Sequence, residues 1–199
     1  MRAGLDATPL TAVSGGIRRY TESLALHLAG HYPDDSILLL SDQQFPSPAG
    51  APANLQSRFY PEYRRWWLRG LPREIRNNRL ELFHGTDFSV PYIRTAPSVL
   101  TLHDLSPWRA DGGHSGAGRV RSRTRWLLRL RRYTMVVTPT EAIRREAIAY
   151  FGLRPDRVRT TPLAAEDCFR PGQEDPPPRP FFLYAGTLEP RKNIDLLVE

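Results

Sequence analysis

Short apolar runs alternate with helix-forming segments along most of this chain, and that alternation limits the folds open to it. Apolar runs occur at residues 2–5, 37–41, 98–103 and 134–138, and helical patterns at residues 15–32, 119–132 and 141–151. Strands that alternate with helices are typical of a parallel sheet with crossover helices. The sequence therefore predicts an α/β fold, a Rossmann-like parallel sheet flanked by helices.

The first helical pattern, residues 15–32, predicts which side of that helix faces the sheet. Four apolar residues fall at helical spacing and are expected to pack on the sheet: Ile17, Tyr20, Leu24 and Leu28. Three polar residues are expected to face outward: Arg18, Arg19 and Glu22. The run at residues 38–40 is all leucine without alternation, as expected of a strand that is covered on both faces.

Composition shifts divide the chain into three parts. Residues 1–170 carry the alternating pattern, residues 171–180 include three consecutive prolines, and residues 181–199 begin with a new apolar run followed by a helix start at Ile194. Proline runs favour extended connections, so we expect residues 171–180 to be an interdomain linker. Residues 181–199 are then expected to be the first strand and helix start of a second, truncated domain.

Two further segments are expected to be loops. Residues 44–54 contain three prolines and a glycine, and residues 109–118 contain four glycines. The second loop lies shortly after the strand at residues 98–103.

The chain is strongly basic, and its basic residues are almost all arginine. The net charge is +7, and Lys192 is the one lysine among 28 basic residues. Arginine is concentrated at residues 64–79 and 119–132, where it could attract phosphate, anionic lipid or nucleic acid, or could form ordinary solvated helix faces. No nucleic acid is expected, because the arginines follow no recognised nucleic-acid motif.

Localisation signals are consistent with the cytoplasm. Residues 1–6 lack the apolar stretch of a secretory signal, and no segment reaches the ~20 apolar residues of a membrane span. A single cysteine, Cys168, can form no internal disulfide, which agrees with a reducing compartment. We expect a cytoplasmic protein that can touch the inner face of the membrane through its arginines.

Two places combine glycine or cationic residues with a helix start, and both suit a diphosphate. Gly15 and Gly16 precede the first helix, whose N–H groups could bind phosphate at close range, although a plain tight turn has the same pattern. Arg191 and Lys192 precede the last helix start and could neutralise a diphosphate. Taken alone the segment could be a surface turn, but after a strand and before a helix it is the most specific short signal in the chain.

Two strand ends carry a histidine and an aspartate. His103 and Asp104 follow one apolar run, and His84 and Asp87 follow another. Ligands of open parallel sheets bind at the carboxyl ends of strands, where such groups could hold sugar hydroxyls or a pyrophosphate oxygen. The alternative is a capping residue beside a hydrogen-bonded histidine.

Five motifs in order resemble the family 4 retaining glycosyltransferases of the GT-B fold, in which two Rossmann-like domains face each other. They are residues 15–20 (GGIRRY), 101–104 (TLHD), 137–141 (VTPTE), 162–171 (PLAAEDCFRP) and 184–193 (YAGTLEPRKN). The resemblance covers essentially the whole chain. It is closest to bacterial mannosyltransferase-like members that act in cell-surface polysaccharide synthesis.

The resemblance implies a nucleotide-sugar donor held mainly by the carboxy-terminal domain and a glycan or lipid-linked acceptor held mainly by this one. Gly16, with Gly15, would approach the donor diphosphate, and Lys192 with Arg191 would neutralise the leaving diphosphate. His103, with Asp104 beside it, would contact the transferred sugar at the catalytic centre. His84 and Asp87 are the candidate acceptor ligands. The loop at residues 109–118 lies just past His103, and we expect it to border the acceptor site and to become ordered on binding.

Retention in this family is usually explained by front-face attack, so no protein nucleophile is expected, and neither are a metal or a cofactor. Two departures limit the resemblance. Some relatives have arginine where this chain has Thr187, and the acidic motif that holds the donor lies beyond Glu199. This chain is therefore expected to be inactive alone. The alternatives are a sugar epimerase of the same architecture and an arginine-rich module that binds nucleic acid or an anionic membrane.

Overall fold

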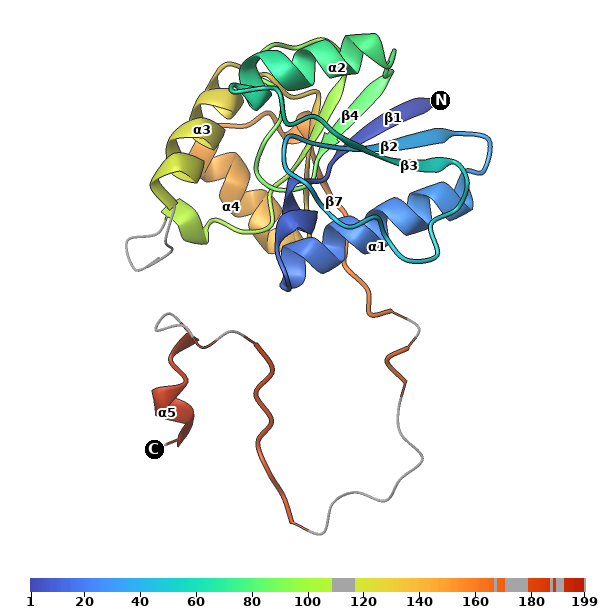
Figure 1. The fold of residues 1–199 in the computed structure, drawn as a ribbon. Coiled ribbons are helices and arrows are strands. Elements are labelled where there is room, and N and C mark those ends of the chain that lie inside the picture. Colours follow the sequence, from blue (N-terminus) through green and yellow to red (C-terminus); the bar gives the residue numbers. More distant parts are fainter. Residues whose placement is uncertain (109–116, 167, 171–178, 187, 189–191, 199) are drawn as a thin grey trace.

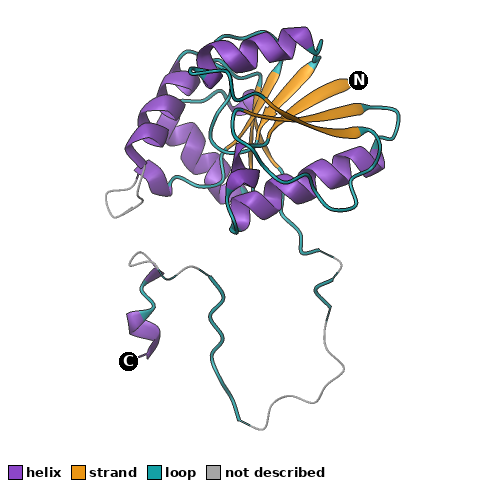
Figure 2. Cartoon of the chain, viewed as in Figure 1, coloured by secondary structure: helices purple, strands orange, loops and turns teal. Residues whose placement is uncertain are grey.

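The computed structural model describes residues 1–108, 117–166, 168–170, 179–186, 188 and 192–198, with the backbone alone for residues 117–119. Its centre is a seven-stranded sheet in the order β3-β2-β1-β4-β5-β6-β7, and all neighbouring strands are parallel. Helices cover both faces of this sheet (Figure 1; Figure 2). The predicted α/β fold with a Rossmann-like parallel sheet is confirmed.

The strands and helices follow the alternation seen in the sequence. The strands are β1 Arg2–Asp6, β2 Ser36–Ser41, β3 Leu55–Phe59, β4 Leu82–Gly85, β5 Ser98–Thr101, β6 Met135–Thr138 and β7 Val158–Thr160. The helices are α1 Gly16–His31, α2 Leu71–Asn77, α3 Ala117–Arg129, α4 Glu141–Phe151 and α5 Asp195–Val198. Short 3-10 turns occupy Thr8–Thr11, Ser106–Trp108 and Pro155–Arg157, and a π-helical turn occupies Trp66–Gly70.

Strand β2 shows why its leucine run has no alternation. Ile37 and Leu39 pack in one apolar cluster with α1, whereas Leu38 and Leu40 pack in a second cluster with α2 on the opposite face. All four side chains are buried, so the strand gains apolar burial on both faces.

The residues of helix α1 that pack on the sheet each lie one position after the predicted ones. The residues that the sheet buries completely are small: Thr21, Ala25 and Ala29. Leu24 and Leu28 are only partly buried and flank this contact. Small side chains let the helix approach the strands closely. The prediction relied on the spacing of the large apolar residues, which lie beside this contact, and so it placed the buried side of the helix one residue too early.

The residues after the expected linker lie apart from the sheet (Figure 1). Phe181, Phe182 and Leu183 are exposed and form no strand, and α5 begins at Asp195, next to the expected Ile194. A strand needs partner strands to bury its apolar side chains, and the described part of the chain offers none there. Most of the predicted linker, residues 171–178, and most of the predicted glycine-rich loop, residues 109–116, lie outside the described residues.

No helix in the described ranges combines the length and the apolarity needed to span a bilayer.

Candidate functional site at the carboxyl ends of the strands

The strand order reverses between β1 and β4, and open parallel sheets form a crevice at such a reversal. The carboxyl ends of β1 and β4 are called the crevice below. From β1 the chain proceeds outward through β2 and β3, and then returns to the other side of β1 as β4. The connections that follow β1 and β4 leave the sheet in opposite directions. Open parallel sheets bind their ligands at the point where two neighbouring strands differ in this way. β1 ends at Asp6, and β4 continues into Thr86 and Asp87.

His103 lies at this crevice with a defined orientation. Its Nε2 is 2.8 Å from the carbonyl oxygen of Thr86, and because a carbonyl only accepts, Nε2 is the nitrogen that donates. The ring contacts Tyr20 edge-on at 4.9 Å between centroids, and Phe88 at 5.7 Å. Tyr20 stands one turn after Gly16, so His103 and the start of α1 share one rim of the sheet.

A chain of polar groups runs beneath His103. The Tyr20 hydroxyl and His84 Nε2 both contact the Thr101 hydroxyl, at 3.1 and 2.8 Å. Burial, followed by the nearby charge of His103, lowers the pKa of His84 to about 4, so its ring is neutral near pH 7. Sequence periodicity assigned Tyr20 to packing alone, yet its hydroxyl connects α1 to the ends of β4 and β5.

Asp6 is a second buried group that the sequence analysis missed. Its Oδ1 accepts from the backbone N–H of Thr8 at 3.0 Å and from the Thr8 hydroxyl at 2.7 Å. Burial nevertheless raises the pKa of Asp6 to about 7. The available signal was a carboxylate directly after the apolar run at residues 2–5, just as Asp104 comes directly after the run at residues 98–103. The Thr86 hydroxyl donates to the Asp6 carbonyl at 2.9 Å and so ties β4 to β1.

Asp87 lies beside Asp6 and His103. Its Oδ1 is buried and has no hydrogen-bond partner among the described residues. Burial raises the pKa of Asp87, while His103 and Arg123 act in the opposite direction. A buried carboxylate oxygen without a donor is costly, so an incoming hydroxyl would find a strong acceptor there.

Asp104 has a local role in the structure. Its Oδ1 accepts from the N–H of Ser106 at 2.9 Å and from the Ser106 hydroxyl at 2.8 Å, which caps the turn Ser106–Trp108. This contact is the capping alternative considered above, and a catalytic role for Asp104 stays a prediction.

The start of α1 is open, as a phosphate site requires. Gly15 has φ +130°, a backbone conformation that favours glycine, and no side chain caps the helix. Added Cβ atoms at Gly15 and Gly16 would meet nothing within 4 Å. Arg18, expected to face outward, instead donates to the carbonyls of Leu10 and Ala12 and so holds the loop before the helix.

The proposed cationic pair is not brought to this crevice. Lys192 is exposed in the segment that lies apart from the sheet, and Arg191 lies outside the described residues. Gly16, His103, His84 and Asp87 are therefore the candidate residues that the fold gathers at one end of the sheet.

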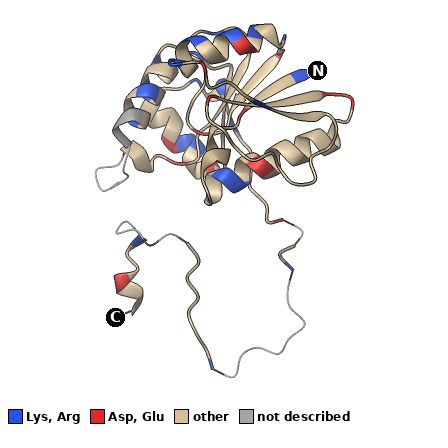
Figure 3. Ribbon diagram, viewed as in Figure 1, with Lys and Arg blue, Asp and Glu red and all other residues tan. Residues whose placement is uncertain are grey.

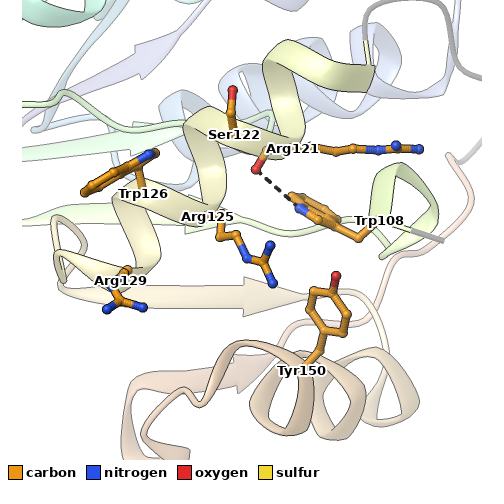
Figure 4. Close-up of a pocket in the computed structure, with 7 residues that line it drawn as sticks. All are labelled: Trp108, Arg121, Ser122, Arg125, Trp126, Arg129 and Tyr150. Carbon is orange, nitrogen blue, oxygen red and sulfur yellow. Dashed lines mark hydrogen bonds between the residues drawn. The ribbon is translucent and has the colours of Figure 1, made fainter. Parts of the chain in front are cut away.

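A hollow lies elsewhere, between α3 and α4. It has a volume of about 770 Å³ and is open to solvent. Figure 4 shows its lining: Trp108, Arg121, Ser122, Arg125, Trp126, Arg129 and Tyr150. Trp108 contacts Phe88 at 5.8 Å, and Phe88 contacts His103, so one layer of aromatic rings separates this hollow from the crevice.

Comparison with known proteins gives two findings. The profile of Glycosyltransferase Family 4 matches residues 14–165, which include most of the sheet and every candidate residue except the cationic pair. The O-antigen chain mannosyltransferase B of Escherichia coli is 31% identical over 136 residues, which are 63% of this chain and 35% of that protein. The chain thus spans about a third of the length of this curated relative. The family match covers most of the chain, and the sheet has the expected parallel topology. The chain therefore belongs to glycosyltransferase family 4, and its sheet is the Rossmann-like half of a GT-B fold.

Proposed function

We propose that this chain is the acceptor side of a retaining glycosyltransferase that moves a sugar from a nucleotide-sugar donor to a glycan or lipid-linked acceptor. The observation that carries the proposal is the crevice at the ends of β1, β4 and β5, where His103 is held between Thr86 and Tyr20 beside the open start of α1. Nucleotide sugars carry a diphosphate and several hydroxyls, and this crevice offers groups suited to each.

The donor diphosphate would lie at the start of α1. The first-turn N–H groups point out of the helix, and the absence of side chains at Gly15 and Gly16 lets an oxygen approach them. Lys192 and Arg191 would add positive charge as the glycosidic bond breaks, which requires residues 181–199 to fold as part of a second domain. A chain without the rest of that domain would be inactive alone.

His103 would position the transferred sugar. Because Nε2 donates to Thr86, Nδ1 is the ring nitrogen that can accept from a sugar hydroxyl. Asp87 and His84 would serve the acceptor, since Asp87 Oδ1 is buried and has no donor among the described residues. Front-face attack would leave the departing phosphate to accept the acceptor proton, so no protein nucleophile is assigned.

Mannose is the proposed sugar and a cell-surface polysaccharide the proposed product. Both rest on the mannosyltransferase that is 31% identical over 136 residues. The proposed setting is the inner membrane surface, where lipid-linked acceptors are accessible from the cytoplasm.

The test joins this chain to the carboxy-terminal half of a family 4 relative and follows label from GDP-mannose into lipid-linked oligosaccharides. His103→Gln is the informative variant, because the glutamine amide can reach Thr86 but places no acceptor at the Nδ1 position. We expect transfer to fall by about a hundredfold or more, as is usual when a positioned polar group is lost. Transfer at the parental rate would refute the role of His103, and donor consumption without acceptor would favour an epimerase.

A further inference from the structure

The solvent side of α3 carries aromatic and aliphatic side chains between arginines. Trp126 is 58% exposed, and Leu130, directly after the helix, is 48% exposed. Arg125 and Arg129 are exposed on the same side, whereas Leu127 and Leu128 are buried in the core. The helix is thus anchored by one side and presents the other side to solvent. The residues Arg125, Trp126, Arg129 and Leu130, with Tyr150 of α4, are called the α3 face below.

The α3 face lies in a stretch of unbalanced charge. Residues 117–133 contain seven arginines and no carboxylate. Figure 4 shows Arg125 and Arg129 pointing to the same side of the helix, with the Arg125 guanidinium 6.0 Å from the centre of the Tyr150 ring. Trp126 stands on the flank beside them. A guanidinium next to an exposed indole combines attraction to phosphate with an apolar body.

The region around helix α2 is also basic, with six arginines and one glutamate in residues 64–79, but it lacks exposed apolar side chains. Arg73 and Arg76 are exposed there, and Figure 3 shows basic residues on both α2 and α3. Trp66 at the start of this region is only 3% exposed, and no large apolar side chain is exposed between residues 60 and 92, all of which are described. Both regions are therefore basic, and only α3 combines its arginines with exposed apolar side chains.

We infer that the α3 face docks the protein on a bilayer rich in anionic phospholipid. Helices that lie in a membrane interface carry arginine together with tryptophan and leucine on the side they present to lipid. Guanidinium groups bind lipid phosphates, and an indole sits at the level of the head groups. Nucleic acid phosphates could also bind the arginines, but nucleic acid would leave Leu130 without an apolar partner. The Tyr150 ring, which could stack on a base, lies under the Arg125 guanidinium.

Docking through the α3 face would hold the crevice close to lipid. Trp108 lines the hollow beside Arg125 and contacts Phe88, which in turn contacts His103. The proposed function places the protein at the inner membrane surface, and this inference adds the face that docks there. It can be tested separately, because lipid binding can be measured without any sugar transfer.

The experiment is co-sedimentation of the 199-residue chain with vesicles of phosphatidylcholine alone or mixed equally with phosphatidylglycerol. We expect binding to the mixed vesicles that weakens with salt, and a blue shift of tryptophan emission. The double variant Arg125→Ser with Arg129→Ser should lower the partition coefficient about thirtyfold. This factor follows because each arginine near an anionic surface contributes about 1 kcal/mol to the free energy of binding. Trp126→Ser should remove most of the emission shift.

The matched control is Arg73→Ser with Arg76→Ser, which removes the same charge from α2. This control should lose less than about threefold, because α2 lacks exposed apolar side chains. An equal loss in the two double variants would show that net charge alone drives binding and would overturn the inference. So would the absence of binding to mixed vesicles, or preferential binding of single-stranded oligonucleotides that depends on Arg125 and Arg129. A failed transfer assay with normal vesicle binding would reject the proposed function and leave this inference standing.

Discussion

Two buried ionisable side chains, Asp6 and His84, have pKa values that are shifted in opposite directions. Asp6 has its pKa raised to about 7 by burial, and His84 has its pKa lowered to about 4 by burial and by His103. Both shifts disfavour the charged form, and both groups lie within one polar layer at the ends of β1 and β4. The free energy of unfolding therefore has a contribution from each that can be measured separately.

The first prediction concerns Asp6→Asn. In the folded protein Asp6 stays protonated up to about pH 7, whereas in the unfolded chain it ionises near pH 3.8, so its contribution is present below pH 3.8 and is lost as pH rises through 7. The shift corresponds to about 4 kcal/mol. Asparagine keeps the oxygen that accepts from Thr8, so chemical denaturation should show the variant gaining stability relative to the parent between pH 4 and pH 8. A constant difference across this range would contradict the raised pKa.

The second prediction concerns His84→Gln. The parent histidine is neutral when folded down to about pH 4 but protonates near pH 6.5 when unfolded, so stability is lost as pH falls from 6.5 to 4. This loss amounts to about 3 kcal/mol. Glutamine can still reach the Thr101 hydroxyl and has no charge to gain, so its unfolding free energy should fall less on acidification. The imidazole signal of His84 in an NMR titration gives an independent check.

Residue chemistry could be predicted in part. His103, His84 and Asp87 were predicted to bind ligand because they lie at the ends of two apolar runs, and ligands of parallel sheets bind where the strands end. Asp6 also follows a strand, yet no histidine accompanies it and no pattern indicated its burial. Arg123 and Arg18 bend back into the domain, and no sequence period distinguishes such an arginine from a solvated one.

At the scale of elements, the ends of β1, β4 and β5 depend on one close backbone approach. Gly85 ends β4, and an added Cβ there would lie 1.5 Å from the carbonyl oxygen of Ser89. The turn that follows presents the Thr86 carbonyl to His103 and places Phe88 N–H on the Thr101 carbonyl at 3.1 Å. Any side chain at this position would force the turn away from the crevice.

The third prediction compares Gly85→Ala with Gly30→Ala. The first should destabilise the protein by about 3 kcal/mol or more, since a backbone atom must move to admit the methyl group. The second lies in α1 with open space around its Cβ and should stabilise by about 0.5–1 kcal/mol, because alanine has the higher helix propensity. Thermal unfolding measures both. A tolerated Gly85→Ala would mean that the turn after β4 is not packed as tightly as described.

The positions of helices and strands were easier to predict than the sides on which they pack. The helix predicted at residues 141–151 matches α4 Glu141–Phe151, because Thr140 caps its start and Gly152 ends it with φ +63°. Strands β3 and β7 were not predicted, because Leu55–Phe59 and Val158–Thr160 have few apolar residues and obtain their pairing from neighbours. Their formation depends on the whole sheet rather than on local pattern.

At the scale of the whole molecule, the strand order is what turns separate motifs into one site. The family motifs near Gly16 and His103 are more than 80 residues apart in sequence, and the reversal between β1 and β4 brings them to one rim. The alternation in the sequence predicts a parallel sheet but not its strand order, since several orders satisfy the same crossover rules. The position of the candidate site was predictable only through the rule that ligands bind at strand ends.

The last prediction concerns the independence of residues 1–170. Phe181, Phe182 and Leu183 are 65–90% exposed, and the segment that contains them lies apart from the sheet, so the domain should not need it for stability. Ending the chain after Arg170 should change the melting temperature by less than about 2 °C, equivalent to less than about 1 kcal/mol for a domain of this size. Ending it after Ala165 instead removes Glu166, which accepts from the Ser23 hydroxyl on α1, and should lower the melting temperature measurably. A large loss after the first truncation would show that the segment packs on the domain and that the boundary lies elsewhere.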